Sequence, residues 1–238
     1  IIEDKNGRLL DIDVHYPDNF NFGYDVVDAL AAEHPDKKAM VWCNTEGEEH
    51  IFSFKDIALA SNRIANVLLS SGIKKGDHVM VALKRHFEYW FTAVALHKIG
   101  AILIPVTHML TSEDYLYRIR EAKVKAIIAT DQNHVPEHIC GALTELEDVP
   151  LLWSVRDGVE GFRNLTSDMK DASETLERQE NLATDPMVMY FTSGTSGQPK
   201  GVIHDYTYPL AHFVTAKYWQ GCFDGGLHFT VSETGWAK

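Results

Sequence analysis

Short apolar segments alternate with amphipathic helical patterns between residues 79 and 155, and this alternation constrains the fold more than any other feature of the chain. The apolar segments lie at 79–83, 101–106, 124–129 and 151–155, and the helical patterns between them at 88–99, 112–122 and 136–146. Apolar runs of this length are typical of strands buried on both faces, as in a parallel sheet covered by helices. The sequence therefore predicts an α/β fold with a parallel sheet flanked by helices.

The residues before this region predict a less regular start. Residues 1–24 mix aromatic residues, Asn and Asp without a clear period, which suggests an extended arm laid over a core. The next expected elements are a short helix at 25–34 and strands at 39–43 and 50–52. Ser53 and Asp56 have the spacing of a capping box, which predicts the start of a helix that ends at Gly72.

The remaining residues predict the start of a second subdomain. Residues 156–185 are polar and irregular, with one weak helical pattern at 168–176, and we interpret them as a linker. The elements expected after the linker are strands at 187–191 and 202–204, a helix at 206–219 and a strand that begins at 227–231. We therefore divide the chain into an N-terminal α/β subdomain at 1–180 and the beginning of a second α/β subdomain at 181–238.

A loop rich in hydroxyl residues and glycine joins the strands expected at 187–191 and 202–204. Residues 192–201 read Thr-Ser-Gly-Thr-Ser-Gly-Gln-Pro-Lys-Gly. The N–H and O–H groups of such a loop can surround an anion, and Lys200 adds a mobile positive charge that suits phosphate. A Walker A loop is excluded, because two residues separate Gly197 from Lys200 and a glycine follows the lysine. The loop predicts a phosphate site, and a flexible solvated turn is the alternative.

Charge and cysteine content limit the partners and the compartment. The 238 residues carry a net charge of −12, which argues against long-range attraction to nucleic acids or anionic membranes. The sequence contains no apolar run long enough for a transmembrane helix and no basic-then-apolar signal pattern. Cys43, Cys140 and Cys222 have neither metal-type nor disulfide-framework spacing, which favours a reducing compartment. We therefore expect a cytoplasmic protein.

The loop and two further segments resemble a known family, the adenylate-forming enzymes, which include acyl-CoA synthetases, luciferases and the adenylation domains of peptide synthetases. Residues 200–204 read Lys-Gly-Val-Ile-His, and Lys-Gly-Val-x-His is common in the acyl-CoA synthetase branch. Residues 231–238 are similar to a segment of acetyl-CoA and medium-chain acyl-CoA synthetases that usually reads Asp-x-Gly-Trp. Glu233 stands where Asp is usual. The resemblance covers nearly the whole chain in the order of strands and helices.

The resemblance implies an acid–CoA ligase of fatty acid metabolism, which would use ATP, Mg²⁺ and CoA to activate a short- or medium-chain carboxylic acid. It implies the phosphate-contacting set Thr192, Ser193, Gly194, Thr195, Ser196, Gly197 and Lys200. His204 and Trp236 would lie near the acyl pocket. The family's catalytic Lys lies in a small C-terminal domain that would follow residue 238. We therefore expect an N-terminal fragment that is inactive by itself.

Other interpretations of these residues remain open at the level of sequence. The chain could be a non-catalytic nucleotide-binding or interaction domain that has kept the loop. His204 could be a buried structural residue, and Trp236 could belong to the core. Residues 84–86 (Lys-Arg-His) follow an expected strand end, where ligands often bind in parallel α/β sheets. We interpret them as an ordinary basic turn, and a contact to the CoA phosphates or to another domain is the alternative.

One motif with metal-binding spacing is also present. Residues 134–138 read His-Val-Pro-Glu-His, which matches the H-x-x-E-H pattern of inverted zinc peptidases. That pattern requires both histidines on one face of a helix, and Pro136 lies where the helix could barely have begun. We therefore interpret the segment as a solvated start of a helix and predict no metal site.

Overall fold

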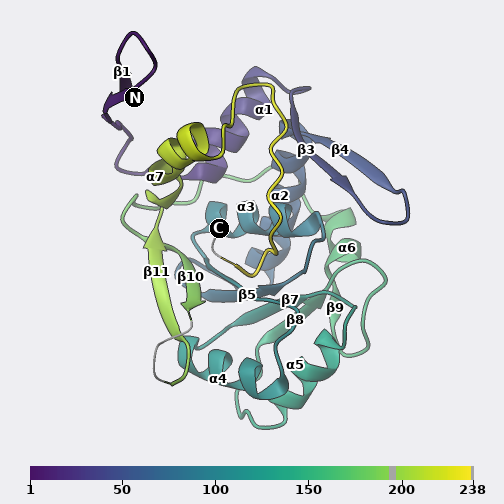
Figure 1. The fold of residues 1–238 in the computed structure, drawn as a ribbon. Helices are drawn as coiled ribbons and strands as arrows, with labels where there is room; N and C mark the ends of the chain where they lie inside the picture. Colours follow the sequence, from purple (N-terminus) through teal and green to yellow (C-terminus); the bar gives the residue numbers. More distant parts are fainter. Residues whose placement is uncertain (193–196, 237–238) are drawn as a thin grey trace.

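A seven-stranded sheet lies at the centre of the computed structural model, which describes residues 1–192 and 197–236 (Figure 1). Its order is β11 (Lys200–Asp205), β10 (Pro186–Thr192), β6 (Ile102–Pro105), β5 (His78–Ala82), β7 (Ala126–Ala129), β8 (Leu151–Ser154) and β9 (Arg163–Asn164). Neighbouring strands are parallel except at β10–β11, which form an antiparallel hairpin. The predicted α/β fold with a mostly parallel sheet is confirmed.

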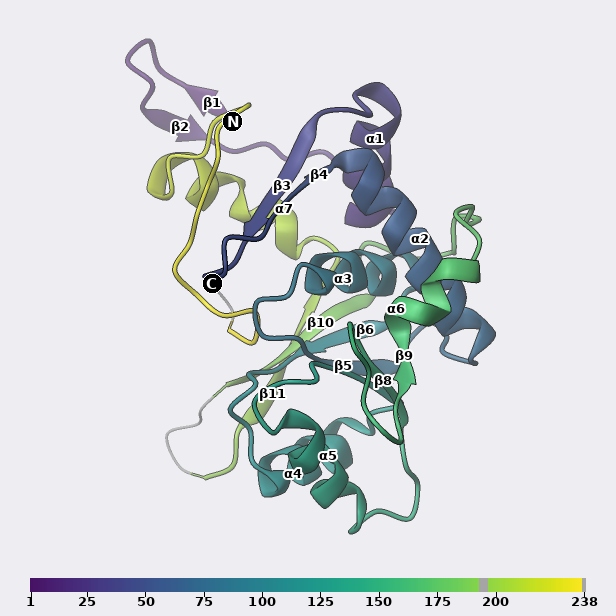
Figure 2. The same cartoon turned by 90° about the vertical axis from the view of Figure 1, so that its right-hand side faces the viewer.

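Helices cover both faces of this sheet, as Figure 2 shows. One face carries the π-helical turn η1 (Gly23–Asp28), α1 (Ala29–Glu33), α2 (Phe54–Ser70), α3 (Glu88–Ile99) and α6 (Leu165–Asp168). The opposite face carries α4 (Ser112–Ala122) and α5 (Val135–Leu143). In β5, Val79 and Val81 pack into the first core, whereas Met80 and Ala82 pack into the second, because successive side chains of a strand point to opposite faces.

Local signals in the sequence place the helix ends. Ser53 and Asp56 form the predicted capping box of α2, in which each side chain binds the backbone N–H of the other residue. Thr111 and Asp114 form a second capping box at the start of α4. Gly100 follows α3 with a φ of 73°, a left-handed conformation that glycine adopts without strain.

The remaining elements lie outside the sheet. They are the strand pairs β1 (Ile2–Glu3) with β2 (Leu9–Asp11) and β3 (Lys38–Cys43) with β4 (Glu49–Ser53), the 3₁₀ turn η2 (Met169–Asp171), the helix α7 (Tyr208–Val214) and the π-helical turn η3 (Thr215–Trp219). The predicted N-terminal arm thus contains a small antiparallel pair, and the predicted helix at 206–219 corresponds to α7 and η3. No helix among the described residues is both long and apolar enough to cross a bilayer.

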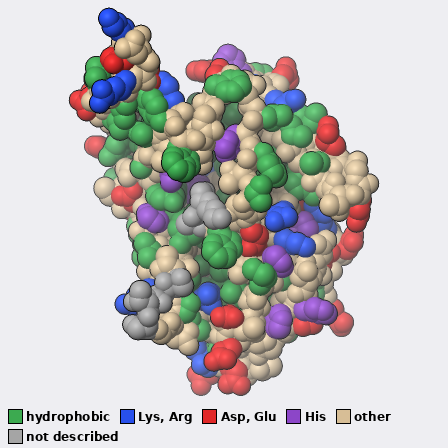
Figure 3. Space-filling model, in the orientation of Figure 1, with side chains coloured by type: hydrophobic (Ala, Val, Ile, Leu, Met, Phe, Trp, Pro, Cys, Tyr) green, Lys and Arg blue, Asp and Glu red, His purple; other side chains and the backbone are tan. Residues whose placement is uncertain are grey.

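Two expected elements are wrong. Instead of the helix expected at 168–176, helical turns span 165–171: Asn164 caps their start by accepting a hydrogen bond from the Ser167 backbone N–H, and they end at Ala172, which is extended. The strand expected at 227–231 is irregular and unpaired in the described part of the chain, where Leu227 and Phe229 are 74% and 86% exposed. Figure 3 shows hydrophobic side chains on the face over which this segment runs.

The strands expected to begin a second subdomain join the central sheet. β10 pairs with β6, where Val188 lies opposite Leu103, and β11 pairs with β10 along its full length. The boundary at 180/181 itself stays a prediction.

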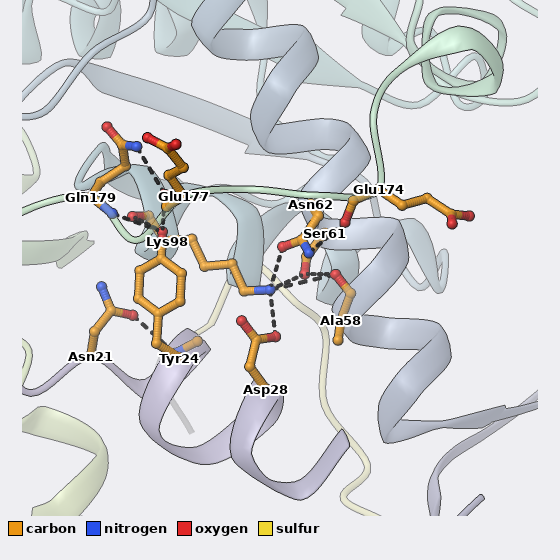
Figure 4. Close-up of polar contacts among 11 residues, drawn as sticks. Asn21, Tyr24, Asp28, Ala58, Ser61, Asn62, Lys98, Glu174, Glu177 and Gln179 are labelled. Atoms are coloured by element: carbon orange, nitrogen blue, oxygen red, sulfur yellow. Dashed lines mark hydrogen bonds and ion pairs between the residues drawn. The ribbon is translucent and has the colours of Figure 1, made fainter. Parts of the chain in front are cut away.

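A buried lysine connects three helical elements on the α2–α3 face (Figure 4). The side chain of Lys98, on α3, is 0% exposed. Its Nζ lies 2.7 Å from Asp28 Oδ1 at the end of η1, and 2.7 Å from Asn62 Oδ1 and 3.0 Å from Ser61 Oγ on α2. Burial lowers the pKa of Lys98, whereas the hydrogen bond and the charge of Asp28 oppose that shift. The lysine therefore holds α3 against both neighbours.

Candidate functional site at the carboxyl edge of the sheet

The parallel strands end at one edge of the sheet, and the residues that follow them are polar. Residues 84–86 follow β5, residues 107–108 follow β6, and Thr130 follows β7. The hairpin β10–β11 turns at the same edge, because β10 runs parallel to β6. Ligands of open α/β sheets bind outside the carboxyl ends of the strands. This edge is therefore the candidate site.

The described residues at the two ends of the hydroxyl- and glycine-rich loop form the end of the β10–β11 ladder. Thr192 lies opposite Lys200, and the Thr192 hydroxyl lies 3.5 Å from the Lys200 carbonyl oxygen. Both residues are exposed. Gly197 has a φ of 117°, which side-chain-bearing residues rarely adopt. The predicted contacts of Ser193, Gly194, Thr195 and Ser196 lie outside the described residues.

Helix α4 contacts the chain on both sides of this loop, at Pro199 just before β11 and at Phe191 on β10. The hydroxyl of Tyr117 donates a hydrogen bond of 2.9 Å to the carbonyl of Pro199, the residue before Lys200. On β10, the Arg118 guanidinium lies 5.3 Å from the centre of the Phe191 ring. Arg118 is held in turn by Asp114 one turn earlier on α4. Sequence reasoning missed both residues, because α4 shows only an amphipathic pattern.

The segment around Trp236 lies on the end of β6. The carboxylate of Glu233 is 3.2 Å from His108 Nδ1, and its Oε1 accepts a 3.4 Å hydrogen bond from the His108 backbone N–H. The hydroxyl of Thr234 donates to the Lys84 carbonyl. A Cβ at Gly235 would collide with the backbone of residues 106 and 107. Trp236 itself is 57% exposed.

The loop and the Trp236 segment, which the sequence singled out separately, meet the same edge of the sheet. Val188 of β10 lies opposite Leu103 of β6, so Thr192 and Thr107 follow at the same level of the two parallel strands. Gly235 packs against Thr107. In Figure 2 the hairpin and the C-terminal segment lie toward the same side of the sheet.

All three residues of the basic turn at 84–86 form hydrogen bonds with other parts of the chain. Lys84 Nζ donates a 2.9 Å hydrogen bond to Asn133, and the Arg85 carbonyl accepts one of 2.7 Å from the Trp42 indole. His86 is buried and its Nε2 lies 2.7 Å from the Thr130 hydroxyl. Burial, and then the positive charge of Arg156, lowers the pKa of His86 to about 4. His86 is therefore neutral at physiological pH, and the guanidinium of Arg85 remains exposed.

His204 lies further along the hairpin from the loop. It shares a face of β11 with Lys200, since the two are four residues apart. Its ring lies 4.2 Å from that of Tyr208 and 6.0 Å from that of Tyr190, centre to centre. Aromatic packing is therefore the environment that the structure gives His204.

The H-x-x-E-H segment has the geometry of a helix start. His134 precedes the first residue of α5, with a φ of 58°, and pairs with Glu137 at 3.4 Å. His138 Nδ1 lies 3.4 Å from the Ser112 hydroxyl. Among the described residues, no three His, Cys, Asp or Glu side chains gather in a way that could hold a metal ion.

The hydroxyl- and glycine-rich sequence between β10 and β11 thus lies at the edge of a mostly parallel sheet where ligands of α/β sheets bind. The family model described as "AMP-binding enzyme" matches residues 27–231, which is most of the chain. The chain therefore belongs to the AMP-binding enzyme family.

The chain is also similar in sequence to several acyl-coenzyme A synthetases. The chain is 34% identical over 235 residues to the Mus musculus acyl-coenzyme A synthetase ACSM3, which covers 96% of the chain and 40% of the relative. It is 32% identical to the Homo sapiens synthetase ACSM4, covering 93% of the chain and 39% of the relative. The Homo sapiens synthetase ACSM5 is 30% identical with the same coverage. The chain thus spans about 40% of the length of these relatives.

The comparisons correct the expected compartment. All three relatives are named as mitochondrial, so the cytoplasmic location predicted from the sequence is wrong. The prediction rested on cysteines without disulfide spacing, and Cys43, Cys140 and Cys222 are indeed free thiols. Free thiols are compatible with any compartment that keeps thiols reduced, so they do not distinguish the cytosol from the interior of an organelle.

Proposed function

We propose that this chain is the N-terminal part of an ATP-dependent acyl-CoA synthetase that acts on short- or medium-chain carboxylic acids. The single observation that supports this most is the hydroxyl- and glycine-rich loop at the carboxyl edge of the sheet, in a chain of the AMP-binding family. The names of the relatives support the acyl-CoA product and a mitochondrial location. The share of their length that the chain covers supports a longer whole protein, in which the catalytic Lys would follow residue 238.

The proposed reaction has two steps. A carboxylate oxygen of the acid attacks the α-phosphorus of ATP, and the bond to the β,γ-diphosphate breaks, which gives an acyl-adenylate and pyrophosphate. The thiol of CoA then attacks the acyl carbonyl carbon, loses its proton, and displaces AMP. The leaving pyrophosphate gains negative charge, so donors fixed around it lower the barrier of the first step.

The loop would supply those donors. Thr192 and Lys200 stand at its two ends, with the Lys200 side chain exposed. We assign the hydroxyls of Thr192, Ser193, Thr195 and Ser196 and the ammonium of Lys200 to the phosphates of ATP. Gly194 and Gly197 would let the backbone approach the phosphates closely. Mg²⁺ would reach the site with the ATP phosphates, whose charge it neutralises, as is usual for nucleotide sites.

The other two substrates would meet at the same edge. We assign Trp236 to the acyl pocket, since its segment packs on the end of β6 beside the loop strand β10. We assign His204 to the border of the same pocket, since it packs against Tyr190 and Tyr208. The exposed guanidinium of Arg85 is a candidate contact for the phosphates of CoA.

Substitution of one loop hydroxyl tests this function. Thr195→Ala in the whole protein is expected to lower acid-dependent ATP–pyrophosphate exchange about 100-fold, the usual loss for one donor to a developing anion. Its thermal unfolding should stay unchanged. Thr144→Ala is the matched control, because that hydroxyl donates to the Gly141 carbonyl on the exposed surface of α5. An unchanged exchange rate in Thr195→Ala would contradict the assignment.

A further inference from the structure

Glu233 holds an unusual position for a charged side chain. Only 10% of it is exposed, and its Oε1 takes both contacts to His108. The second oxygen, Oε2, is buried without a hydrogen-bond partner among the described groups. Burial of a carboxylate is costly unless hydrogen-bonding partners are fixed around it, so the contact with His108 must offset that cost.

The charge of Glu233 lies over the sheet edge between two helices. Tyr89 of α3 and Tyr115 of α4 both have raised pKa values, mainly because they are buried, and in both the negative charge of Glu233 adds to the rise. The hydroxyl of Tyr115 is also buried without a hydrogen-bond partner in the described part of the chain. Among the described residues, His108 pairs with Glu233 and these two phenols feel its charge, and Arg118 and Asp114 act on the same Tyr115 phenol.

Residues 232–236 are fixed at three successive points. Glu233 binds His108, Thr234 binds the Lys84 carbonyl, and Gly235 lies against the backbone of residues 106 and 107. The backbone N–H of Trp236 donates a 3.1 Å hydrogen bond to the Glu233 carbonyl. This turn links the position of Trp236 to that of Glu233. Of these three contacts, the Glu233–His108 contact is made by a charged side chain, so it can be removed by substitution without altering the backbone.

We propose that Glu233 is a positioning residue that, through His108, seats Gly235 and Trp236 on the end of β6 and thereby sets the wall of the acid-binding pocket. This inference rests on the proposed function, because it takes Trp236 as part of that pocket. Without the carboxylate, residues 234–236 lose the charged contact at Glu233 and can move away from the sheet edge. Binding of the acid should then weaken, whereas binding of ATP at the hairpin should not.

The test uses the whole protein and the variants Glu233→Ala and Glu233→Gln. In Glu233→Ala the KM for the acid should rise about tenfold, which corresponds to the loss of one hydrogen bond to a charged group. The KM for ATP should stay unchanged, and the order of preference among acids from acetate to laurate should change. Glu233→Gln keeps an oxygen that can accept from His108, so it should restore most of the loss.

Hydrogen exchange supplies a readout that does not need activity. The backbone amides of residues 234–236 should exchange faster in Glu233→Ala than in the wild type. Glu137→Ala is the matched control, because the His134–Glu137 pair has the same groups but side chains that are 82% and 69% exposed. It should alter neither the KM for the acid nor exchange at 234–236.

The possible failures are distinguishable. An unchanged acid KM and unchanged amide exchange in folded Glu233→Ala overturn the positioning role. A similar rise of the acid and ATP KM values, with no rescue by Gln, also overturns it and indicates a general structural role. If the wild type shows no acid-dependent exchange of pyrophosphate with ATP, the proposed function fails, and faster amide exchange in Glu233→Ala would still support the seating of the segment.

Discussion

At the scale of single residues, the buried ammonium of Lys98 is the group that depends most on its hydrogen-bond partners. Its three N–H donors are satisfied by Asp28, Ser61 and Asn62, and they join α3 to η1 and α2. A buried charge that loses its partner usually costs more than the pair contributes. Lys98 is therefore expected to matter for the folding of this face rather than for chemistry, because all its described partners are structural groups.

Lys98→Met tests this interpretation. The substitution leaves Asp28 partly buried without its cation, so the free energy of unfolding should fall by about 3 kcal/mol. Lys75→Met is the control, since Lys75 forms a 2.7 Å pair with Asp185 with a side chain that is 48% exposed. That change should cost at most about 1 kcal/mol. Equilibrium urea unfolding compares the two, and equal losses would contradict the special role of Lys98.

His97 should make the fold sensitive to acid. Both of its ring nitrogens are buried without hydrogen-bond partners in the described structure, and burial lowers its pKa from 6.5 to about 4. Between these values the unfolded chain binds a proton that the folded chain does not, so stability falls as the pH drops from about 6.5 to about 4. The loss should be on the order of 3 kcal/mol, and neutral buried His86 adds a loss of the same sign.

Urea unfolding across this pH range measures the effect. His97→Gln should flatten the fall in stability, although His86 leaves part of it. The exposed His34→Gln should leave the slope as it is in the wild type. A slope that does not change in His97→Gln would show that His97 is not buried in its neutral form.

At the scale of elements, α4 contacts the hairpin whose connecting sequence is the hydroxyl- and glycine-rich loop at 192–201. Tyr117 contacts Pro199, the residue before β11, and Arg118 contacts Phe191 on β10. A rigid helix that contacts the chain on both sides of the loop limits how far Thr192 and Lys200 can move. Such restraint lowers the cost of fixing donors around a bound phosphate.

Tyr117→Phe removes one hydroxyl from this contact and leaves the ring. We expect the KM for ATP to rise about threefold to tenfold, with a loss of stability of no more than about 1 kcal/mol. Tyr206→Phe is the matched control, because it removes a 2.7 Å hydrogen bond from a tyrosine hydroxyl to the His97 carbonyl, away from the loop. Steady-state kinetics with varied ATP measures the KM for ATP in both variants. Equal KM values would refute the role of α4.

Some helices and strands have the bounds that the sequence predicts, and others do not. The helices at 88–99 and 112–122 have the predicted bounds, because Gly100 and the Thr111–Asp114 capping box are local signals. The strand expected at 227–231 failed, because an apolar run becomes a strand only where a partner strand pairs with it. In the candidate site, His108 and Glu233 are 125 residues apart and Tyr117 and Pro199 are 82 apart, so only the fold brings them together.

At the scale of the whole molecule, one edge of the sheet brings together Thr192 and Lys200 at the ends of the hydroxyl- and glycine-rich loop, the basic turn after β5 and the segment of Trp236. This arrangement is the physical basis of the proposed synthetase, since the acid, the ATP phosphates and CoA must meet at one place. The chain spans about 40% of the length of its relatives, and the reaction proposed for a longer protein is measured on that whole protein.

The most direct test is acid-dependent ATP–pyrophosphate exchange by the whole protein, with a series of straight-chain acids from acetate to laurate. We predict exchange that requires the acid and that is fastest with a short- or medium-chain member of the series. A folded protein that binds ATP and shows no exchange with any acid would contradict this prediction, and would favour a nucleotide-binding domain without catalytic activity.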